Sequence, residues 1–428
     1  MQKNIYPKQD IWATLCQRAG QRYNDLYPVV RPILQAVKMQ GDEAVRQYIA
    51  QFDKVEITDF IVSEAEFAEA NLQVSTELKQ AIDVARHNIT TFHEAQREPI
   101  REIETTKGVV CWRKSIPITR VGLYIPSQNA PLFSTILMLG IPATLAGCKE
   151  IVLCTPPNQA GKIHPVILYT AALLGIKQVR KCGGVQAIGA MAYGTASIPK
   201  VDKILGPSNA YVTAAKQLVA EEGVAIDLPA GPSEVLIIAD ETANPVFVAA
   251  DLLSQAEHGI DSQVVLATDS EAMADAIIAE IAQQLACLPR KEIAAQSLEK
   301  SHILVFHNLT EAMCFSNEYA PEHLILATKD AEIWAQEVIN AGSVFLGHYT
   351  PESAGDYASG TNHTLPTAGY ARVTGGVSLD SFVKKVTFQH ISKEGIANLG
   401  STIEIMAEAE GLHAHKNAVT VRLQSLKI

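Results

Sequence analysis

The stretch VGLYIPSQNAPLFSTILMLGIPATLAGCKEIVLC, residues 121–154, decides the fold. A short aliphatic run at 121–125 leads into a polar loop, a helical apolar pattern at 132–146 and a second aliphatic run at 151–154. No residue from Val121 to Cys148 is charged, but three prolines and the polar segment Ser127-Gln128-Asn129 interrupt any membrane span. We therefore interpret the stretch as a strand, a loop, a buried helix and a second strand.

The same alternation continues along the chain. Further aliphatic runs lie at 178–181, 203–205, 235–238, 264–267, 302–306, 324–327 and 342–346, and the helical patterns between them lie at 166–174, 209–220, 245–258 and 270–285. This order is typical of an α/β fold with parallel strands and helices on both faces. We predict two open, mostly parallel, incomplete Rossmann-like sheets. One covers about 120–233, and the other uses segments on either side of it.

Four regions follow from this reading. We expect an N-terminal helical arm at 1–24, a discontinuous α/β domain at 25–120 and 234–372, a second α/β domain at 121–233 and a small C-terminal tail domain at 373–428. The 428 residues are enough for such an arrangement, and a hydrophobic content of 47% with only 6% aromatic residues suits helices packed on buried sheets.

Charge and cysteine usage limit the class of protein. The net charge of −11 and the lack of basic runs disfavour nucleic acid as a partner. The seven cysteines are widely spaced with no CxxC pair, which is typical of free thiols in a reducing compartment. The N-terminus carries no signal-peptide pattern, so we expect a cytoplasmic protein without a membrane segment.

Histidines and carboxylates gather late in the sequence. Nine of the twelve histidines lie at or after His258. They occur at loops and helix ends beside acidic residues, which favours a site that combines metal binding with proton transfer.

Two motifs of this stretch suggest ligands. Gln255 and His258 are three residues apart at the end of a predicted helix, so both leave from one face; carbonyl capping by the histidine is the alternative. Asp356 lies in a loop rich in small residues that extends to His363, where a ligand-binding loop competes with an ordinary turn.

Other motifs suggest acid–base chemistry. Glu322 and His323 precede a strand, where a histidine can act as a general base and a carboxylate can activate water, or both can simply be polar residues at a strand start. Glu410 precedes His413 and His415, which diverge on a helix, so only one of these histidines should serve a given site.

Several segments, in this order, resemble histidinol dehydrogenases from about residue 25 to the C-terminus. The matching segments are VGLYIP (121–126), CGGVQA (182–187), VDKILGPSNA (201–210), LPAGPSE (228–234), 252–263, 317–326, 359–366 and 414–418. The resemblance implies a zinc- and NAD-dependent oxidation of L-histidinol to L-histidine through L-histidinal, the last steps of histidine biosynthesis. It also implies a homodimer whose subunits share their active sites.

The resemblance assigns roles to individual residues. It implies that the zinc ion, one per subunit, is bound by Gln255, His258, Asp356 and His415, the last from the partner chain, and that Glu322 and His323 are catalytic. Substrate contacts would come from the four metal ligands together with Ser233, His323, His363 and Glu410, and NAD contacts from Tyr124, Gln186 and Asn209 in the domain at 121–233.

This sequence departs from the family in two loops. Ser127-Gln128 and Ser208 stand where the family usually has glycine. If those positions need a positive φ, each replacement costs about 1 kcal/mol or reshapes the loop, which would affect nucleotide binding. Two other functions compete with the dehydrogenase: a zinc hydrolase in which Glu322 drives a metal-bound water, and a non-catalytic regulator that binds NAD or an amino acid and holds structural zinc.

Overall fold

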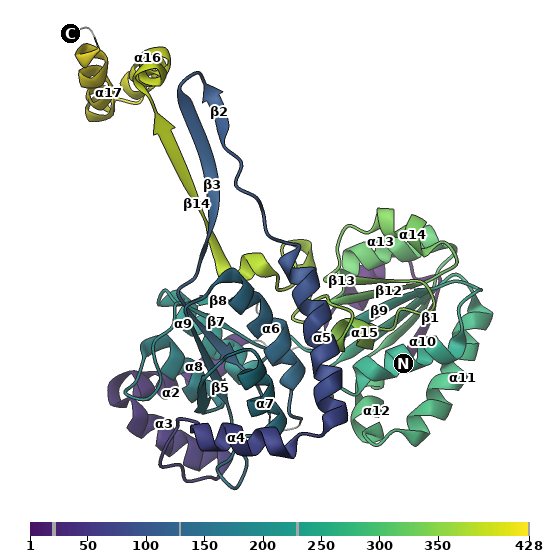
Figure 1. The fold of residues 1–428 in the computed structure, drawn as a ribbon. Helices are drawn as coiled ribbons and strands as arrows, with labels where there is room; N and C mark the ends of the chain where they lie inside the picture. The colour runs from purple at the N-terminus through teal and green to yellow at the C-terminus, as the bar shows by residue number, and fades with distance from the viewer. Residues whose placement is uncertain (19–22, 128–129, 228–230, 427–428) are drawn as a thin grey trace.

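Two parallel sheets and one antiparallel sheet organise the chain in the computed structural model (Figure 1), which describes residues 1–18, 23–127, 130–227 and 231–426. The larger parallel sheet has the order β1 (Gln2–Ile5), β11 (His302–Val305), β10 (Gln263–Thr268), β9 (Glu234–Ala239), β12 (His323–Ala327) and β13 (Ser343–Leu346). The smaller has the order β6 (Gln178–Lys181), β5 (Glu150–Thr155), β4 (Arg120–Tyr124), β7 (Lys203–Leu205) and β8 (Ala225–Ile226).

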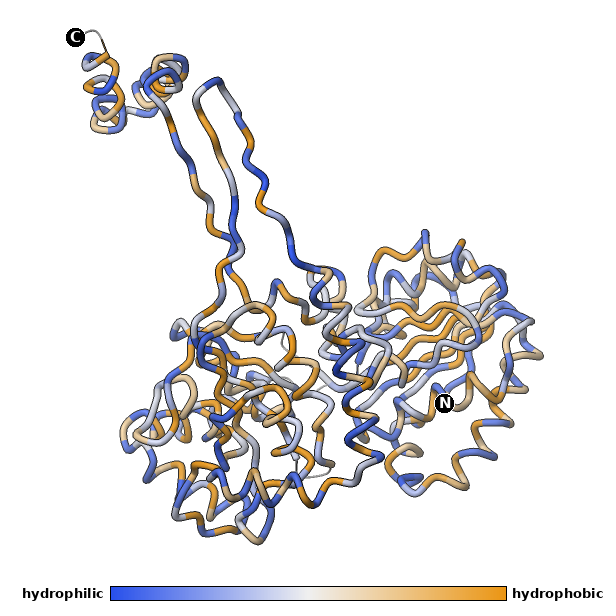
Figure 2. Tube along the Cα trace, in the orientation of Figure 1, coloured by the Kyte–Doolittle hydropathy of each residue, from blue (hydrophilic) through white to orange (hydrophobic). Residues whose placement is uncertain are grey.

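Helices cover both faces of the six-stranded sheet. Alternate strand residues point to opposite faces, so Val235 and Ile237 face one helix layer while Leu236 and Ile238 face the other. The first layer contains α10 (Pro245–Ala256), α11 (Glu271–Cys287) and α12 (Lys291–Glu299), and the second contains α1 (Trp12–Leu15), α13 (Leu309–Tyr319) and α14 (Ala331–Trp334). Figure 2 shows hydrophobic residues along the strands between these layers.

The five-stranded sheet is covered in the same way. One face packs against α2 (Tyr27–Gln40), α3 (Asp42–Tyr48), α8 (Gly184–Tyr193) and α9 (Ala210–Glu221), and the other against α4 (Glu64–Gln73), α5 (Thr76–Glu94), α6 (Phe133–Ala146) and α7 (Pro165–Leu173). Short helices connect these elements: η1 (Gln9–Ile11), η2 (Tyr23–Leu26), η3 (Ile49–Asp53), η4 (Ala335–Glu337), η5 (Tyr370–Arg372) and η6 (Leu379–Phe382).

A projecting arm carries the C-terminus away from both sheets (Figure 1). It contains the antiparallel sheet β14 (Val383–Ile391), β3 (Val109–Pro117) and β2 (Ile103–Thr106), followed by α16 (Lys393–Ala409) and α17 (His413–Ser425). Trp112 and Phe388 stack on this sheet with ring centroids 5.6 Å apart. The tips of α16 and α17 leave Ile405, Met406 and Val421 largely exposed.

The predicted fold class is confirmed, and each aliphatic run in the sequence corresponds to one strand of a parallel sheet. Two parts of the arrangement differ from expectation. Gln2–Ile5 form an edge strand beside β11 inside the region expected to be a helical arm. Residues 26–89 contribute their buried side chains to the five-stranded sheet, whereas the sequence analysis grouped them with 234–372. Amphipathic helices show which of their own faces is buried but not which sheet covers it.

Two further observations concern the described residues. None of their helices combines the length and apolarity that crossing a membrane would require. All seven cysteines are free thiols.

Candidate active site

Most of the predicted site residues lie at the end of the six-stranded sheet where its central strands begin. A helix between two parallel strands runs back against them, so it ends where the next strand begins. The end of α10 therefore brings Gln255 and His258 to the amino ends of β9 and β12. The first residue of β9 is Glu234, and the first residue of β12 is His323. This topology makes neighbours of segments separated by up to a hundred residues.

A pocket of about 600 Å³ opens between this end of the larger sheet and the loop that follows β7 of the smaller sheet. Residues 206–210 come from the carboxyl end of β7, so the pocket combines opposite ends of the two sheets. The wall on the side of the larger sheet comes from residues within 231–233, 258–262, 322–323, 356–357 and 363–367.

Glu322 and His323 are fixed by the same backbone unit, that of Glu234. The Glu234 N–H donates to Glu322 Oε2 at 2.8 Å, and the Glu234 carbonyl lies 3.0 Å from His323 Nδ1. Because a carbonyl only accepts, Nδ1 must carry the proton when the ring is neutral. His323 Nε2 is then the basic nitrogen. It has no hydrogen-bond partner within the described part of the chain and lies 3.6 Å from Asp356 Oδ1.

The site contains more buried carboxylates than cations. Burial raises the pKa of Glu322 and that of Glu352 to about 8 each. For His323, burial lowers the pKa, but the carboxylates of Glu322 and Asp356 outweigh it and raise the value to about 10; a cation held by Asp356 would weaken this effect and favour the neutral ring. Burial opposes ionisation of Asp356, yet its contact with His323 holds the pKa below the usual range. Such a set favours a bound cation or ammonium group.

A candidate metal centre lies beside this pair. One ligand atom each from His258, Glu352 and Asp356 falls within 4.8 Å of the others. His258 lines the pocket and is partly exposed, and desolvation by the surrounding protein lowers its pKa, which favours the neutral imidazole that metals bind. Gln255 is fully buried; with its amide nitrogen toward Glu352, it donates to that carboxylate and accepts from Glu234 N at 3.0 Å.

Glu352 is the member of this centre that the sequence analysis missed. It opens α15 (Glu352–Tyr357) directly after Pro351, and Asp356 follows four residues later. Residues four apart share one face of a helix, so the pair Glu352 and Asp356 could have been recognised from a proline-initiated helix in this loop.

We expect Glu352→Gln to weaken Zn²⁺ affinity by about 10- to 100-fold, because the variant keeps the side-chain shape but removes a carboxylate. Competition with a chromogenic chelator measures the change. Glu257→Gln is the matched control, since Glu257 lies next to His258 but outside the cluster. Equal affinity in the Glu352 variant and the wild type would remove Glu352 from the metal centre.

The predicted substrate residues are divided between the pocket and the arm. Ser233 and His363 line the pocket, and His363 is held by Thr135 Oγ1 at 3.2 Å and by the carbonyl of Asp356 at 2.9 Å. Glu410 ends α16 and His415 lies on α17, at the far end of the arm (Figure 1). The chain's own pocket therefore receives neither of the last two.

The predicted NAD residues lie at the carboxyl ends of the strands in the five-stranded sheet. Asn209 caps α9 and lines the pocket, while Tyr124 and Gln186 are buried next to it without lining it. The Tyr124 hydroxyl accepts from the N–H of Gly184 at 3.2 Å. Neither amide atom of Gln186 has a hydrogen-bond partner among the residues described, a feature that suits a polar ligand at these strand ends.

At the two described serines, the loop departures carry no backbone penalty. Ser127 and Ser208 are absent from the residues with positive φ, and each hydroxyl is hydrogen-bonded, to the Pro156 carbonyl and to Thr213 Oγ1. Gln128 lies outside the described residues. The position that does require glycine is Gly206, with φ of 140° and a backbone packed against the Tyr124 carbonyl.

Comparisons with known proteins agree over almost the whole chain. The family model for histidinol dehydrogenase matches residues 16–423. Histidinol dehydrogenase of Bacteroides thetaiotaomicron is 57% identical over 422 residues, which is 99% of each protein. That of Escherichia coli is 54% identical over 400 residues, covering 93% of this chain and 91% of the relative. A crystal structure of histidinol dehydrogenase from Elizabethkingia anophelis superposes with a TM-score of 0.98 at 57% identity, covering 100% and 99% of the two chains.

The fold, the acid–base pocket and these matches define the class of protein as an oxidoreductase with two α/β sheets. Within that class, the chain belongs to the histidinol dehydrogenase family.

Proposed function

We propose that the protein oxidises L-histidinol to L-histidine through L-histidinal and reduces two NAD, in the last steps of histidine biosynthesis. Each subunit would hold one zinc ion for this reaction. The observation that carries the proposal is the geometry of His323. Its Nδ1 is fixed by the Glu234 carbonyl, and its Nε2, which has no hydrogen-bond partner among the described residues, lies in a carboxylate-rich pocket. Identity of 57% over nearly the full length with a protein named histidinol dehydrogenase supports the choice of substrate.

The chain's own residues supply the proton transfers. His323 Nε2 takes the hydroxyl proton as the carbinol carbon loses a hydride, which gives the aldehyde. Glu322 accepts a proton from the water that adds to this aldehyde, and the protonated His323 returns its proton to the carbonyl oxygen, which gives the hydrate. Loss of a second hydride and a second proton from the hydrate gives the acid. General acid–base help of this kind contributes about 10²–10⁴-fold. When bound, NAD would accept the hydrides, and zinc would anchor the amine and imidazole of the substrate.

The proposal assigns Gln255, His258 and Asp356 to the zinc ion, now with Glu352 beside them, and Ser233 and His363 to the substrate. Tyr124, Gln186 and Asn209 are assigned to NAD. The smaller sheet around 121–233 is then the nucleotide-binding domain, and the larger one carries the metal and the catalytic pair.

A homodimer completes the proposed site. His415 and Glu410 lie at the end of an arm that projects from the body, where exposed apolar side chains of α16 and α17 remain available for contact. We assign both residues to the pocket of the partner subunit. The cytoplasmic location expected from the sequence stays a prediction.

An NADH absorbance assay with L-histidinol tests this function. We expect two NADH per histidinol consumed, dependence on added Zn²⁺ after chelation, and oxidation of L-histidinal without prior histidinol. A zinc-loaded protein that produces no NADH would reject the dehydrogenase, and histidine-ester hydrolysis without NAD would favour the hydrolase instead.

A further inference from the structure

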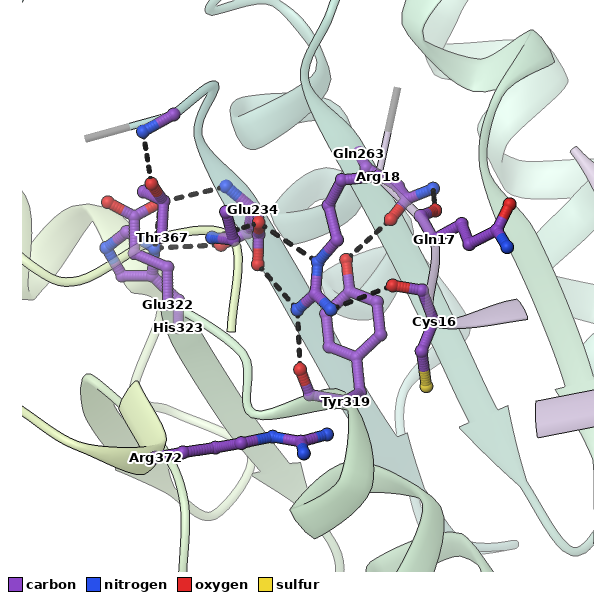
Figure 3. Close-up of polar contacts among 12 residues, drawn as sticks. Cys16, Gln17, Arg18, Glu234, Gln263, Tyr319, Glu322, His323, Thr367 and Arg372 are labelled. Carbon is purple, nitrogen blue, oxygen red and sulfur yellow. Dashed lines mark hydrogen bonds and ion pairs between the residues drawn. The ribbon is translucent and has the colours of Figure 1, made fainter. Parts of the chain in front are cut away.

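A buried ion pair joins the N-terminal segment to the first residue of β9 (Figure 3). Arg18 Nε and Nη2 donate to the two carboxylate oxygens of Glu234 at 3.2 and 3.1 Å, and the two side chains are 15% and 2% exposed. A two-pronged contact of this kind fixes orientation as well as distance, because the guanidinium is planar and rigid. Glu234 directly follows Ser233, which lines the pocket.

Arg18 also connects Glu234 to the segments around it. Its Nη1 donates to the carbonyl of Cys16 at 2.9 Å, its Nη2 to the carbonyl of Tyr319 at 2.5 Å, and its guanidinium carbon lies 3.6 Å from the centroid of the Tyr319 ring. The N–H of Ala368 donates to Glu234 Oε1 at 2.7 Å. Four chain segments therefore meet at this single ion pair.

Two strained residues border the same contacts. Ala320, directly after Tyr319, has φ of 52°, and Ala368 has φ of 54°. A left-handed backbone costs a residue with a Cβ on the order of 1 kcal/mol, and it persists where its surroundings leave no alternative. Ala320 precedes Pro321-Glu322-His323, so the strained turn leads directly into the catalytic pair. The Arg18 contact to the Tyr319 carbonyl helps to hold that turn.

The backbone of Glu234 connects the ion pair with Arg18 to the catalytic residues. Its N–H orients the Glu322 carboxylate, and its carbonyl selects the ring nitrogen of His323 that faces the pocket. Figure 3 shows Glu234 between Arg18 on one side and Glu322 and His323 on the other. Arg18 itself is not among the described residues that line the pocket, so it acts through Glu234.

We propose that Arg18 is a positioning residue for the oxidation: its ion pair with Glu234 holds the backbone N–H and carbonyl of Glu234, which orient Glu322 and His323. The proposal rests on the proposed function for its kinetic readout. Arg18→Ala is expected to lower kcat for histidinol by about 10- to 100-fold, because a misplacement of 1 Å has an effect of this size, while the KM of histidinol and the zinc content stay within about two-fold of wild type.

Chemical rescue separates positioning from general stability. Guanidinium chloride at low, non-denaturing concentration should restore part of the kcat of Arg18→Ala, whereas sodium chloride at equal ionic strength should not. Arg372→Ala is the matched control, since Arg372 bonds the carbonyl of Glu318 at the same helix end and makes no contact with Glu234 in the described structure. An unchanged kcat in Arg18→Ala with only a lower Tm, or no guanidinium effect, overturns the proposal.

A second variant and a spectroscopic readout cover the remaining outcomes. Arg18→Lys keeps the positive charge but cannot make the bidentate contact with the Glu234 carboxylate. A wild-type kcat in this variant would overturn the proposal even if Arg18→Ala fails to fold. NMR of zinc-loaded protein labelled with ¹⁵N-histidine, at a pH at which His323 is neutral, should show the ring protonated at Nδ1 in the wild type and a mixed tautomer in Arg18→Lys. The tautomer of His323 can be measured even if the wild-type protein does not oxidise histidinol. That failure would reject the proposed function but not the positioning role of Arg18. An unchanged tautomer would reject the positioning role alone.

Discussion

Replacing His323 with asparagine is expected to lower kcat for histidinol by about 10²–10⁴-fold while the zinc content stays at the wild-type level. The asparagine amide can occupy the position of Nδ1 and keep the hydrogen bond to the Glu234 carbonyl, which is 3.0 Å away in the wild type. What the variant lacks is Nε2, the nitrogen without a partner among the described residues. The substitution thus removes the proposed base and leaves its anchor.

Steady-state kinetics together with metal analysis measures this effect. His307→Asn is the control, because His307 is exposed and stacks on Tyr6 at the far edge of the larger sheet. Turnover close to wild type would show that another group takes the proton. Loss of zinc from His323→Asn would instead identify His323 as a metal ligand.

The opposite pattern is expected for His258→Asn, which should weaken zinc binding on the order of 100-fold or more. His258 is the one imidazole whose ligand atom lies within 4.8 Å of those of Glu352 and Asp356 in the described cluster. Asparagine is shorter and a poorer ligand, so the ion would keep the two carboxylates, Gln255 and His415 of the partner subunit but lose its imidazole from this chain. Activity should fall in proportion to the metal lost.

Two measurements check this second expectation. Dialysed protein is analysed for zinc, and activity is then followed as Zn²⁺ is added back; the variant should require far more of it than the wild type. His348→Asn serves as the control, since that histidine contacts Thr242 and lies outside the pocket. Full zinc occupancy after dialysis would contradict the assignment of His258 as a ligand.

The sequence was most informative where strands are buried on both faces. Residues 234–239 and 323–327 are buried throughout, and the uninterrupted aliphatic runs 235–238 and 324–327 within them predicted β9 and β12 correctly. The strand Gln2–Ile5 escaped prediction because it is polar and lies at a sheet edge. Residues 383–391 form the long strand of the arm, and their mixed pattern reflects a sheet that projects away from the two helix-covered sheets (Figure 1).

The site was predictable in its chemistry but not in its connections. The sequence places Gln255, His258 and Asp356 near helix ends and loops, and the resemblance to histidinol dehydrogenases supplied their roles. The contribution of Glu234 could not be predicted, because it acts through its backbone N–H and carbonyl, which every residue except proline possesses. Likewise, no pattern in the sequence indicates that Ala320 adopts a left-handed conformation.

The arm has a genetic consequence under the proposed dimer. A substitution near its tip harms the neighbour's pocket and spares its own, whereas a substitution in the body does the reverse. Two differently defective alleles expressed together can therefore assemble one intact pocket in a mixed dimer, and partial growth without histidine would reveal that complementation.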